Sequence, residues 1–222
     1  MSSVIKFFLD GGIFMLFLLI CSVISVTVMI WRGMALRREE VVPTELRHAV
    51  EAGNHAENQV MELVKGNDSA LARILNVVLR HLMWPKSENM EAVQVRARAE
   101  MVKLEKGMVV LEVMVGVTPL LGLLGTVAGL VTIFSGLGTE GTADPHIIAG
   151  GIAEALNTTI MGLAIAMPSL IAHSYFTKKI EEMAIDMETL VADFMTTCYR
   201  QEVKLPERET GNSLRYAPKN GD

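Results

Sequence analysis

Three long, uncharged apolar runs dominate the hydropathy pattern of the chain. They cover residues 11–31, 113–139 and, with His173 neutral, 155–177. A helix needs about 20 apolar residues to cross the roughly 30 Å hydrocarbon core of a membrane, so each run is long enough. The first run is preceded by Asp10, where a signal peptide carries positive charge, and we therefore expect it to be retained.

The segment between the first two runs has helical periodicity. Apolar residues three and four positions apart predict an amphipathic helix over 68–83, with Asp68 as its N-cap and Pro85 just beyond its end. Gly53 and Gly66 punctuate the chain before it, which predicts two shorter helices there.

Two helices are expected to extend beyond the apolar runs. From residue 88 no Gly or Pro interrupts the pattern until Gly107, and the pattern then enters the second run, which predicts one helix over about 88–137. The third run continues at helical spacing through Phe194. After Leu205 the composition becomes polar and rich in Pro and Gly, which predicts a disordered tail.

Basic residues are distributed unevenly along the chain. Of the 20 Lys and Arg residues, 12 lie in 32–106, seven follow Ser174, Lys6 alone precedes the first run, and none lies in 138–146. Segments rich in Lys and Arg stay in the cytoplasm. The N-terminus and the 138–146 loop are therefore expected outside, and 32–106 and the C-terminal segment in the cytoplasm.

These patterns predict an all-α membrane protein with three transmembrane helices and long cytoplasmic helical extensions. The expected segments, in order, are an external N-terminus (1–10), a first transmembrane helix (11–31), a cytoplasmic helical domain (32–106), a second transmembrane helix (107–137), an external loop (138–146), a third transmembrane helix (147–173), a cytoplasmic helix (174–204) and a disordered tail (205–222).

Composition narrows the class of function. Apolar residues make up 50% of the 222 residues, aromatic residues only 5%, and the formal net charge of −5 lacks the positive balance of a nucleic-acid-binding protein. The two Cys and five His show no metal-ligand spacing, and no nucleophile–base pair or phosphate-binding loop is found. We expect no enzymatic activity, no metal, no cofactor and no nucleic-acid partner.

One acidic residue lies inside the expected third transmembrane helix, 147–173. Glu154 is seven residues past the outer end of the third span, about 10 Å into the hydrocarbon at 1.5 Å per residue. An ionisable side chain at that depth is costly unless it faces protein, water or a partner, which marks Glu154 as a candidate functional residue. The alternative is a protonated structural Glu bonded to a helix carbonyl.

Threonine hydroxyls accompany this acid. Thr126 and Thr159 each lie twelve residues from the loop that joins their antiparallel helices, so we expect them at matching levels near the membrane centre. On a helical wheel Thr158 shares the side of Glu154, whereas Thr159 is about 140° away. An acid and hydroxyls stacked along the membrane normal are typical of a proton relay, although a Thr hydroxyl also bonds back to its own helix.

Small residues and prolines punctuate the last two spans. Gly125 and Gly129 form a GxxxG pair, and Gly122 adds a third small position, a pattern that favours close helix packing. Pro119 and Pro168 each remove a helical hydrogen bond, and we expect both to influence how these helices pack.

The paired segments PLLGLLGTVAGL (119–130) and GGIAEALNTTIMGLAIAMP (150–168) resemble the MotA/TolQ/ExbB proton channel family, most closely its ExbB/TolQ branch. The resemblance covers roughly residues 5–200. It implies that Glu154 is the acid of the third span and that Thr126 and Thr159 are its threonine partners. Thr158 is a further candidate, because on the helical wheel it lies on the same side as Glu154.

The resemblance also implies an assembly and a role. The chain would form a homo-oligomer, as a pentamer, in lipid of the bacterial inner membrane, around a dimer of an ExbD-like single-span protein. It would couple the proton-motive force to a TonB-like protein that energises transport across the outer membrane. Two alternatives stay open, a TolQ-like motor for envelope integrity and a non-conducting membrane scaffold. A MotA-type flagellar stator is disfavoured, because that branch has four spans.

Overall fold

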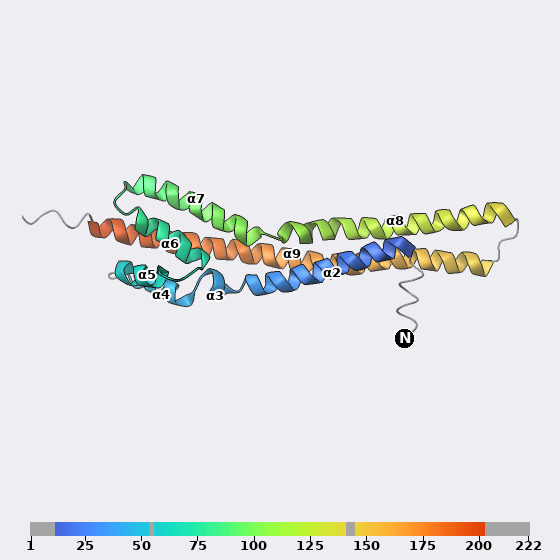
Figure 1. The fold of residues 1–222 in the computed structure, drawn as a ribbon, viewed down its shortest axis with the longest axis horizontal. Coiled ribbons are helices and arrows are strands. Elements are labelled where there is room, and N and C mark those ends of the chain that lie inside the picture. Colours follow the sequence, from blue (N-terminus) through green and yellow to red (C-terminus); the bar gives the residue numbers. More distant parts are fainter. Residues whose placement is uncertain (1–11, 54–55, 141–144, 203–222) are drawn as a thin grey trace, which may run out of the picture. The chain divides into compact units, whose positions relative to one another are not determined.

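The computed structural model describes residues 12–53, 56–140 and 145–202, and the regular structure within these ranges is entirely α-helical. Figure 1 follows the helices along the chain. They are α2 (Gly12–Ala35), α3 (Arg38–Val41), α4 (Thr44–Glu51), α5 (Ala56–Val64), α6 (Ala70–Arg80), α7 (Lys86–Glu105), α8 (Met108–Glu140) and α9 (Pro145–Glu202).

The predicted all-α class with three candidate transmembrane helices and long helical extensions is confirmed. Three segments are long and apolar enough to cross a membrane, Ile13–Ala35, Met108–Ser135 and Ile148–Arg200. The third apolar run continues into one long helix as predicted, since α9 has 58 residues. Three predictions fall outside the described residues. They concern the external N-terminus (1–10), the disordered tail (205–222) and the centre of the external loop (141–144).

The chain divides into two compact units, and α9 contributes to both. The first unit comprises Met1–Val41 and Ala99–Ala184, and the second comprises Val42–Arg98 and Ile185–Asp222. Each unit has buried apolar residues of its own.

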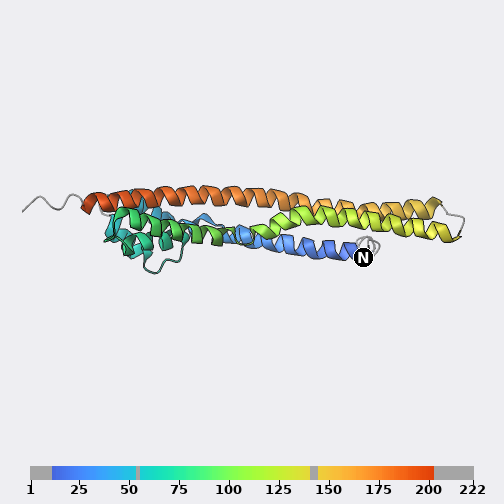
Figure 2. The ribbon, with the colours of Figure 1, turned by 90° about the horizontal axis from the view of Figure 1, so that it is seen from above.

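In the first unit, α2, α8 and the first part of α9 lie side by side in both views (Figures 1 and 2). Met15 and Leu18 of α2 are fully buried, as is Leu111 of α8. Most of the other apolar side chains face outward. In the most apolar 18-residue stretch of each span, only 17% of the residues are buried in Ile13–Ala35, 28% in Met108–Ser135 and 33% in Ile148–Arg200. A surface this apolar needs lipid or other protein chains to cover it.

The second unit packs α4, α5, α6, the first part of α7 and the end of α9 around an apolar core. Its largest fully buried side chains include Leu46, Leu71, Ile74, Leu75, Phe194 and Met195. The two shorter helices predicted before α6 are present as α4 and α5. Gly53 and Gly66 follow them and adopt positive φ angles of +70° and +89°. These values suit glycine, which has no Cβ to clash with the backbone.

The amphipathic helix predicted over 68–83 is present as α6, but its predicted cap is wrong. Ser69, and not Asp68, is the N-cap: it has extended backbone angles, and its hydroxyl accepts a hydrogen bond of 3.2 Å from the Ala72 N–H. The side chain of Asn67 in turn accepts from the Ser69 N–H at 2.9 Å. The sequence offered several capping residue types in a row, and backbone geometry selected the last of them.

A buried polar network in the second unit was not predicted. Asn89 of α7 is fully buried and donates to the Val78 carbonyl of α6 at 3.1 Å and to the Tyr199 hydroxyl of α9 at 2.9 Å. That hydroxyl donates to the Trp84 carbonyl at 3.0 Å. The network ties α6, the turn before α7, and α9 together, and no sequence pattern connects residues so far apart in the chain.

The single helix predicted over about 88–137 is also wrong, because the chain breaks at Gly107. Its φ angle is +89°, and it lies between the end of α7 at Glu105 and the start of α8 at Met108. A Cβ at this position would lie 3.1 Å from Cζ3 of Trp31. The buried Arg32 side chain donates to the Leu104 carbonyl at the end of α7, which satisfies one of the groups that the break exposes.

Replacing Gly107 by Ala is expected to destabilise the protein by about 1–2 kcal/mol, because an L-residue is strained at positive φ. Thermal unfolding followed by circular dichroism in detergent measures the effect. Gly116→Ala is the matched control: Gly116 lies within α8 with nothing within 4 Å of an added Cβ, so Ala there should be neutral or stabilising. Equal melting temperatures for Gly107→Ala and the parent would contradict the strained break.

Candidate functional site

α8 and α9 approach each other closely where glycines face backbone. A Cβ added at Gly122 would lie 2.8 Å from the Thr158 carbonyl oxygen, and one at Gly162 would lie 2.5 Å from the Thr118 carbonyl oxygen. Real side chains do not fit at such distances. The pairing of residues near 122 with residues near 160, and of Gly129 with Ala155, shows that the two helices are antiparallel.

The other two predicted packing glycines face the same helix. A Cβ at Gly125 would lie 2.7 Å from the Thr158 hydroxyl and 3.2 Å from Cβ of Phe14 in α2, and one at Gly129 would lie 2.8 Å from Cβ of Ala155. The GxxxG pair therefore packs within the chain. Gly162 completes this contact from α9, and its signal in the sequence is a lone small residue between larger apolar ones.

The close approach brings Thr126 and Thr159 together. Their hydroxyls are hydrogen-bonded to each other, so the predicted match in level between the two residues is confirmed. Two carbonyl acceptors lie within reach of the single Thr126 hydroxyl hydrogen, that of Ala155 across the helix pair at 3.1 Å and that of Gly122 on its own helix at 3.2 Å. The hydroxyl can therefore bond back to its own helix or across to its neighbour.

Three hydroxyls converge on the carbonyl oxygen of Gly122. Those of Thr126, Thr158 and Thr159 lie 3.2, 3.0 and 3.1 Å from it. A carbonyl has two lone pairs, so three hydroxyls compete for it, and each has a second acceptor within reach. We define these three threonines as the hydroxyl cluster. Because each hydroxyl both donates and accepts, the cluster can exchange partners without moving its backbone.

Thr158 is the member of the hydroxyl cluster that lines the same pocket as Glu154. Its side chain is 3% exposed and bonds to the Ala155 carbonyl at 2.7 Å as well as to that of Gly122. Thr158 and Glu154 line the same pocket, as their shared side of the helix predicts. The helical wheel favoured Thr158 and the family resemblance favoured Thr159, and both residues belong to the hydroxyl cluster.

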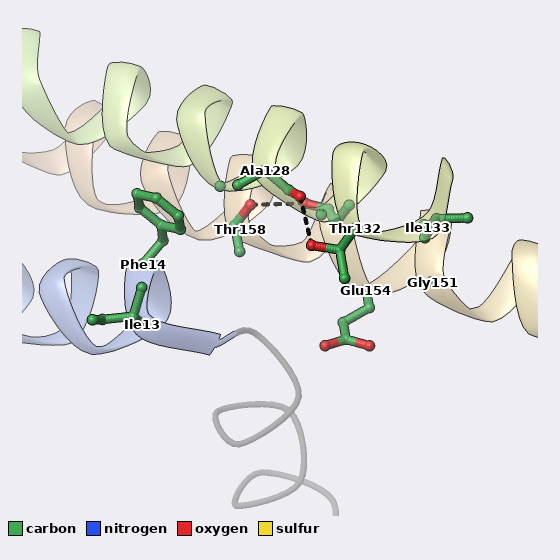
Figure 3. A pocket seen from close by; sticks show the side chains of 11 residues that line it. Ile13, Phe14, Ala128, Thr132, Ile133, Gly151, Glu154 and Thr158 are labelled. Carbon is green, nitrogen blue, oxygen red and sulfur yellow. Dashed lines mark hydrogen bonds between the residues drawn. The ribbon is translucent and has the colours of Figure 1, made fainter. Parts of the chain in front are cut away.

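Glu154 lines a surface pocket of about 310 Å³ between α2, α8 and α9. In Figure 3 Phe14 points from α2 toward the other two helices, whereas the Glu154 carboxylate points away from α8. The side chain is exposed, and within the described residues nothing forms a hydrogen bond or ion pair with it. The alternative of a Glu bonded to a helix carbonyl of its own chain is absent from this part of the structure.

The pocket includes a hydroxyl that the sequence analysis did not single out. Thr132 of α8 lines it with Glu154 and donates to the Ala128 carbonyl at 3.0 Å (Figure 3). A Thr six residues after Thr126 is not on the same helix face by simple periodicity, which is why the pattern did not reveal it.

Both predicted prolines lie inside continuous helices, Pro119 in α8 and Pro168 in α9. Each stands next to a fully buried hydroxyl residue. Thr118 donates to the Met114 carbonyl at 2.7 Å, and Ser169 donates to the Ile165 carbonyl at 2.8 Å. These hydroxyls add hydrogen bonds where proline removes one, as is common in membrane helices.

No group of His, Cys, Asp or Glu that could hold a metal ion is found among the residues that the structure describes. The polar groups at and beside the pocket are the exposed carboxylate of Glu154, the hydroxyl cluster and nearby helix carbonyls. Such groups bind and pass protons or accept polar partners.

The chain is similar to a known protein family and to several known proteins. A family model described as the MotA/TolQ/ExbB proton channel family matches residues 65–189. The chain is 30% identical to "Putative biopolymer transport protein ExbB-like 1" of Synechocystis, over 95% of this chain and 84% of that protein. It is 32% identical to "Biopolymer transport protein exbB1" of Vibrio cholerae, over 69% of this chain and 70% of that protein.

A third relative comes from an archaeon. The chain is 36% identical to "Putative biopolymer transport protein ExbB homolog" of Methanothermobacter thermautotrophicus, over 50% of this chain and 39% of that protein.

Gly162→Ala is expected to separate α8 from α9 and to lower stability by about 1–3 kcal/mol, because the added methyl meets backbone that cannot move aside. Thermal unfolding in detergent measures the change. Gly150→Ala is the matched control on the same helix, since nothing lies within 4 Å of its added Cβ. Similar melting temperatures for the two variants would mean that the glycine contact does not hold the helices together.

Proposed function

This chain belongs to the MotA/TolQ/ExbB proton channel family, and we propose that it is the proton-channel subunit of a membrane motor. In this proposal it couples the proton-motive force, with an ExbD-like single-span partner, to a TonB-like protein that energises transport across the outer membrane. The observation that carries the proposal is an exposed carboxylate, Glu154, beside a cluster of hydroxyls inside apolar spans.

Glu154 is the proposed proton-binding group. Its carboxylate lies on an apolar helix without a partner among the described residues of its own chain, so it is available to water and to a partner's acidic side chain. The hydroxyl cluster extends from Thr158 to Thr126 and Thr159, deeper along the same helix pair. In this proposal a proton received at Glu154 passes toward these hydroxyls by way of the pocket that Glu154 and Thr158 both line.

The energy available is sufficient for mechanical output. Moving one charge across a potential of 100 mV releases about 2.3 kcal/mol. In the proposed mechanism the partner's membrane aspartate takes and releases protons opposite Glu154, and its changing charge makes one helix of the partner move relative to this chain.

The exposed apolar surface supports an oligomer. With most of each apolar window unburied, the spans need neighbours as well as lipid. We propose a homopentamer that surrounds a dimer of the ExbD-like protein and turns the Glu154 pocket toward a neighbouring helix. The pocket of about 310 Å³ accommodates large side chains of such a helix.

The proposed location is the bacterial inner membrane, with the N-terminus periplasmic and the C-terminus cytoplasmic, because Lys and Arg are concentrated in 32–106 and after Ser174.

Reporter fusions test this orientation. A fusion at Glu140 should report a periplasmic location and a fusion at Asp68 a cytoplasmic one, measured with paired alkaline phosphatase and fluorescent-protein reporters. A cytoplasmic signal at Glu140 would refute the orientation, and with it the direction of the proton path.

Glu154→Gln is expected to assemble normally and to lose proton-driven activity by roughly a hundredfold or more, because Gln keeps the shape but does not titrate. The measurement is proton flux into liposomes that hold this chain with its single-span partner. Glu154→Asp should keep part of the activity. Glu188→Gln, an exposed Glu on the same helix in the second unit, is the matched control and should behave as the parent.

The hydroxyl cluster is tested in the same assay. Thr126→Val and Thr159→Val delete a hydroxyl at nearly constant volume and should lower flux more than stability. Thr189→Val is the control, since that exposed hydroxyl only bonds back to Ile185 at 2.9 Å.

Full flux in Glu154→Gln, with assembly verified in the same liposomes, would favour a scaffold that does not conduct protons.

A further inference from the structure

The break between α7 and α8 lies where two apolar spans end, and the proposed proton path does not use it. The uncharged apolar run 11–31 of α2 ends at Trp31, and the candidate span of α8 begins at Met108. Gly107 lies directly before Met108 and against the Trp31 ring, and all three residues belong to the first unit. The break is therefore at the level where the hydrocarbon of a membrane gives way to its headgroups.

A buried cation lies behind this break. Arg32 is 3% exposed, and its Cδ is 3.5 Å from the position of a Cβ added at Gly107. One end of the guanidinium donates to the Leu104 carbonyl, whereas its Nε has no hydrogen-bond partner. Among the residues that the structure describes, no carboxylate forms an ion pair with Arg32, and the buried Glu100 is bonded to Lys103 at 3.0 Å. A buried charge is costly unless an opposite charge lies beside it.

The first turn of α8 adds hydrogen-bond donors at the same place. This helix has 33 residues and begins at Met108. The first N–H groups of a helix have no carbonyl partner within it, and the helix dipole places partial positive charge at this end. Such N–H groups point toward the N-terminal end of their helix, here toward Gly107 and away from the apolar span. Together with a nearby guanidinium they are suited to a phosphate group.

The rim of the break suits a lipid rather than a soluble phosphate compound. The Trp31 ring is 46% exposed, and tryptophan is enriched at membrane interfaces. Ile30 and Val109 are exposed at 59% and 66% on the hydrocarbon side of the break. The acyl chains of a lipid would cover these apolar side chains, whereas a soluble phosphate compound would leave them exposed.

The charged side chains at the break favour an anionic headgroup. Lys106 is exposed and forms no ion pair within the described part of the chain. With Arg32 it gives two positive charges against one negative charge, that of the exposed Glu105. Glu112 is also exposed, but it lies one turn further along α8, about 6 Å from the helix start.

We propose that the break between α7 and α8 binds the phosphate of an anionic phospholipid. The phosphate accepts hydrogen bonds from the first N–H groups of α8 and lies next to the positive charges of Arg32 and Lys106. The acyl chains follow Ile30 and Val109, and the Trp31 ring lies beside the glycerol ester groups. A zwitterionic headgroup adds an ammonium group that Arg32 and Lys106 repel, so it binds less tightly. The proposal requires the apolar spans but not proton conduction.

Quenching of Trp31 fluorescence tests the proposal. The chain has two tryptophans, so Trp84→Phe leaves Trp31 as the only one. The full-length Trp84→Phe protein in a neutral detergent is titrated with phosphatidylglycerol or phosphatidylcholine carrying the same brominated acyl chains, because bromine quenches tryptophan only at short range. We expect half-maximal quenching at an about fivefold lower fraction of phosphatidylglycerol, the gain from one basic side chain near an anionic headgroup.

Matched variants in this background locate the site. Lys106→Gln removes an exposed charge beside the break and should remove most of the preference for phosphatidylglycerol, because it cancels the positive balance there. Lys86→Gln makes the same change at the exposed first residue of α7, in the second unit, and should leave the preference unchanged.

Three results would contradict the proposal. The first is equal quenching by the two lipids, or no quenching by either, in the Trp84→Phe protein, which needs no further variant. The second is an unchanged preference in Lys106→Gln when both proteins unfold at the same temperature. The third is a loss of preference in Lys86→Gln as large as that in Lys106→Gln, which would trace the preference to overall charge. The assay does not involve proton flux, so its outcome is separate from that of the proposed channel function.

Discussion

The backbone contact between α8 and α9 is the constraint on which the first unit depends. At Gly122 and Gly162 each helix leaves no room for a side chain, and the carbonyl oxygens of one helix come within reach of hydroxyls on the other. In an apolar environment an unpaired hydroxyl is costly, so the threonines and the glycines require each other. The glycines permit the approach, and the hydroxyl cluster makes the approach favourable.

That contact also separates two kinds of surface. Polar groups of the hydroxyl cluster are satisfied inside the helix pair, whereas the carboxylate of Glu154 faces outward from it. The polar groups between the two helices are thus hydrogen-bonded, whereas the exposed carboxylate has no hydrogen-bond partner among the described residues. Together with the outward-facing apolar side chains, this makes the first unit a component whose surface must be covered by lipid or by other chains.

The second unit is built on different physics. It has an apolar core around α6, and the hydrogen bonds of Asn89 and Tyr199 link α6, α7 and α9 beside that core. Its Cys198 is buried, and burial raises the pKa of that thiol to about 12, so it stays a neutral core side chain. Charge appears at the rim, where Arg47 bonds to Glu51 at 2.9 Å, an interaction that raises the pKa of Arg47 and keeps it charged.

The sequence by itself determined the features that follow from local periodicity and from the cost of moving charge into hydrocarbon. It determined the three apolar spans, the helical class and the apolar stripe of α6, because each depends only on neighbouring residues and on the thickness of a membrane. Matching levels for Thr126 and Thr159 followed from counting along two joined helices.

Only the tertiary structure decided which residues far apart in the sequence meet. The break at Gly107 depends on a positive φ angle and on the nearby Trp31, neither of which is visible in a pattern that continues through the residue. The glycine motif did not say which helix it contacts, and the wheel did not show that Thr158 and Thr159 share the Gly122 carbonyl. The physical reason is that periodicity fixes the face of a helix, whereas the rotation and offset of two packed helices depend on the side chains of both.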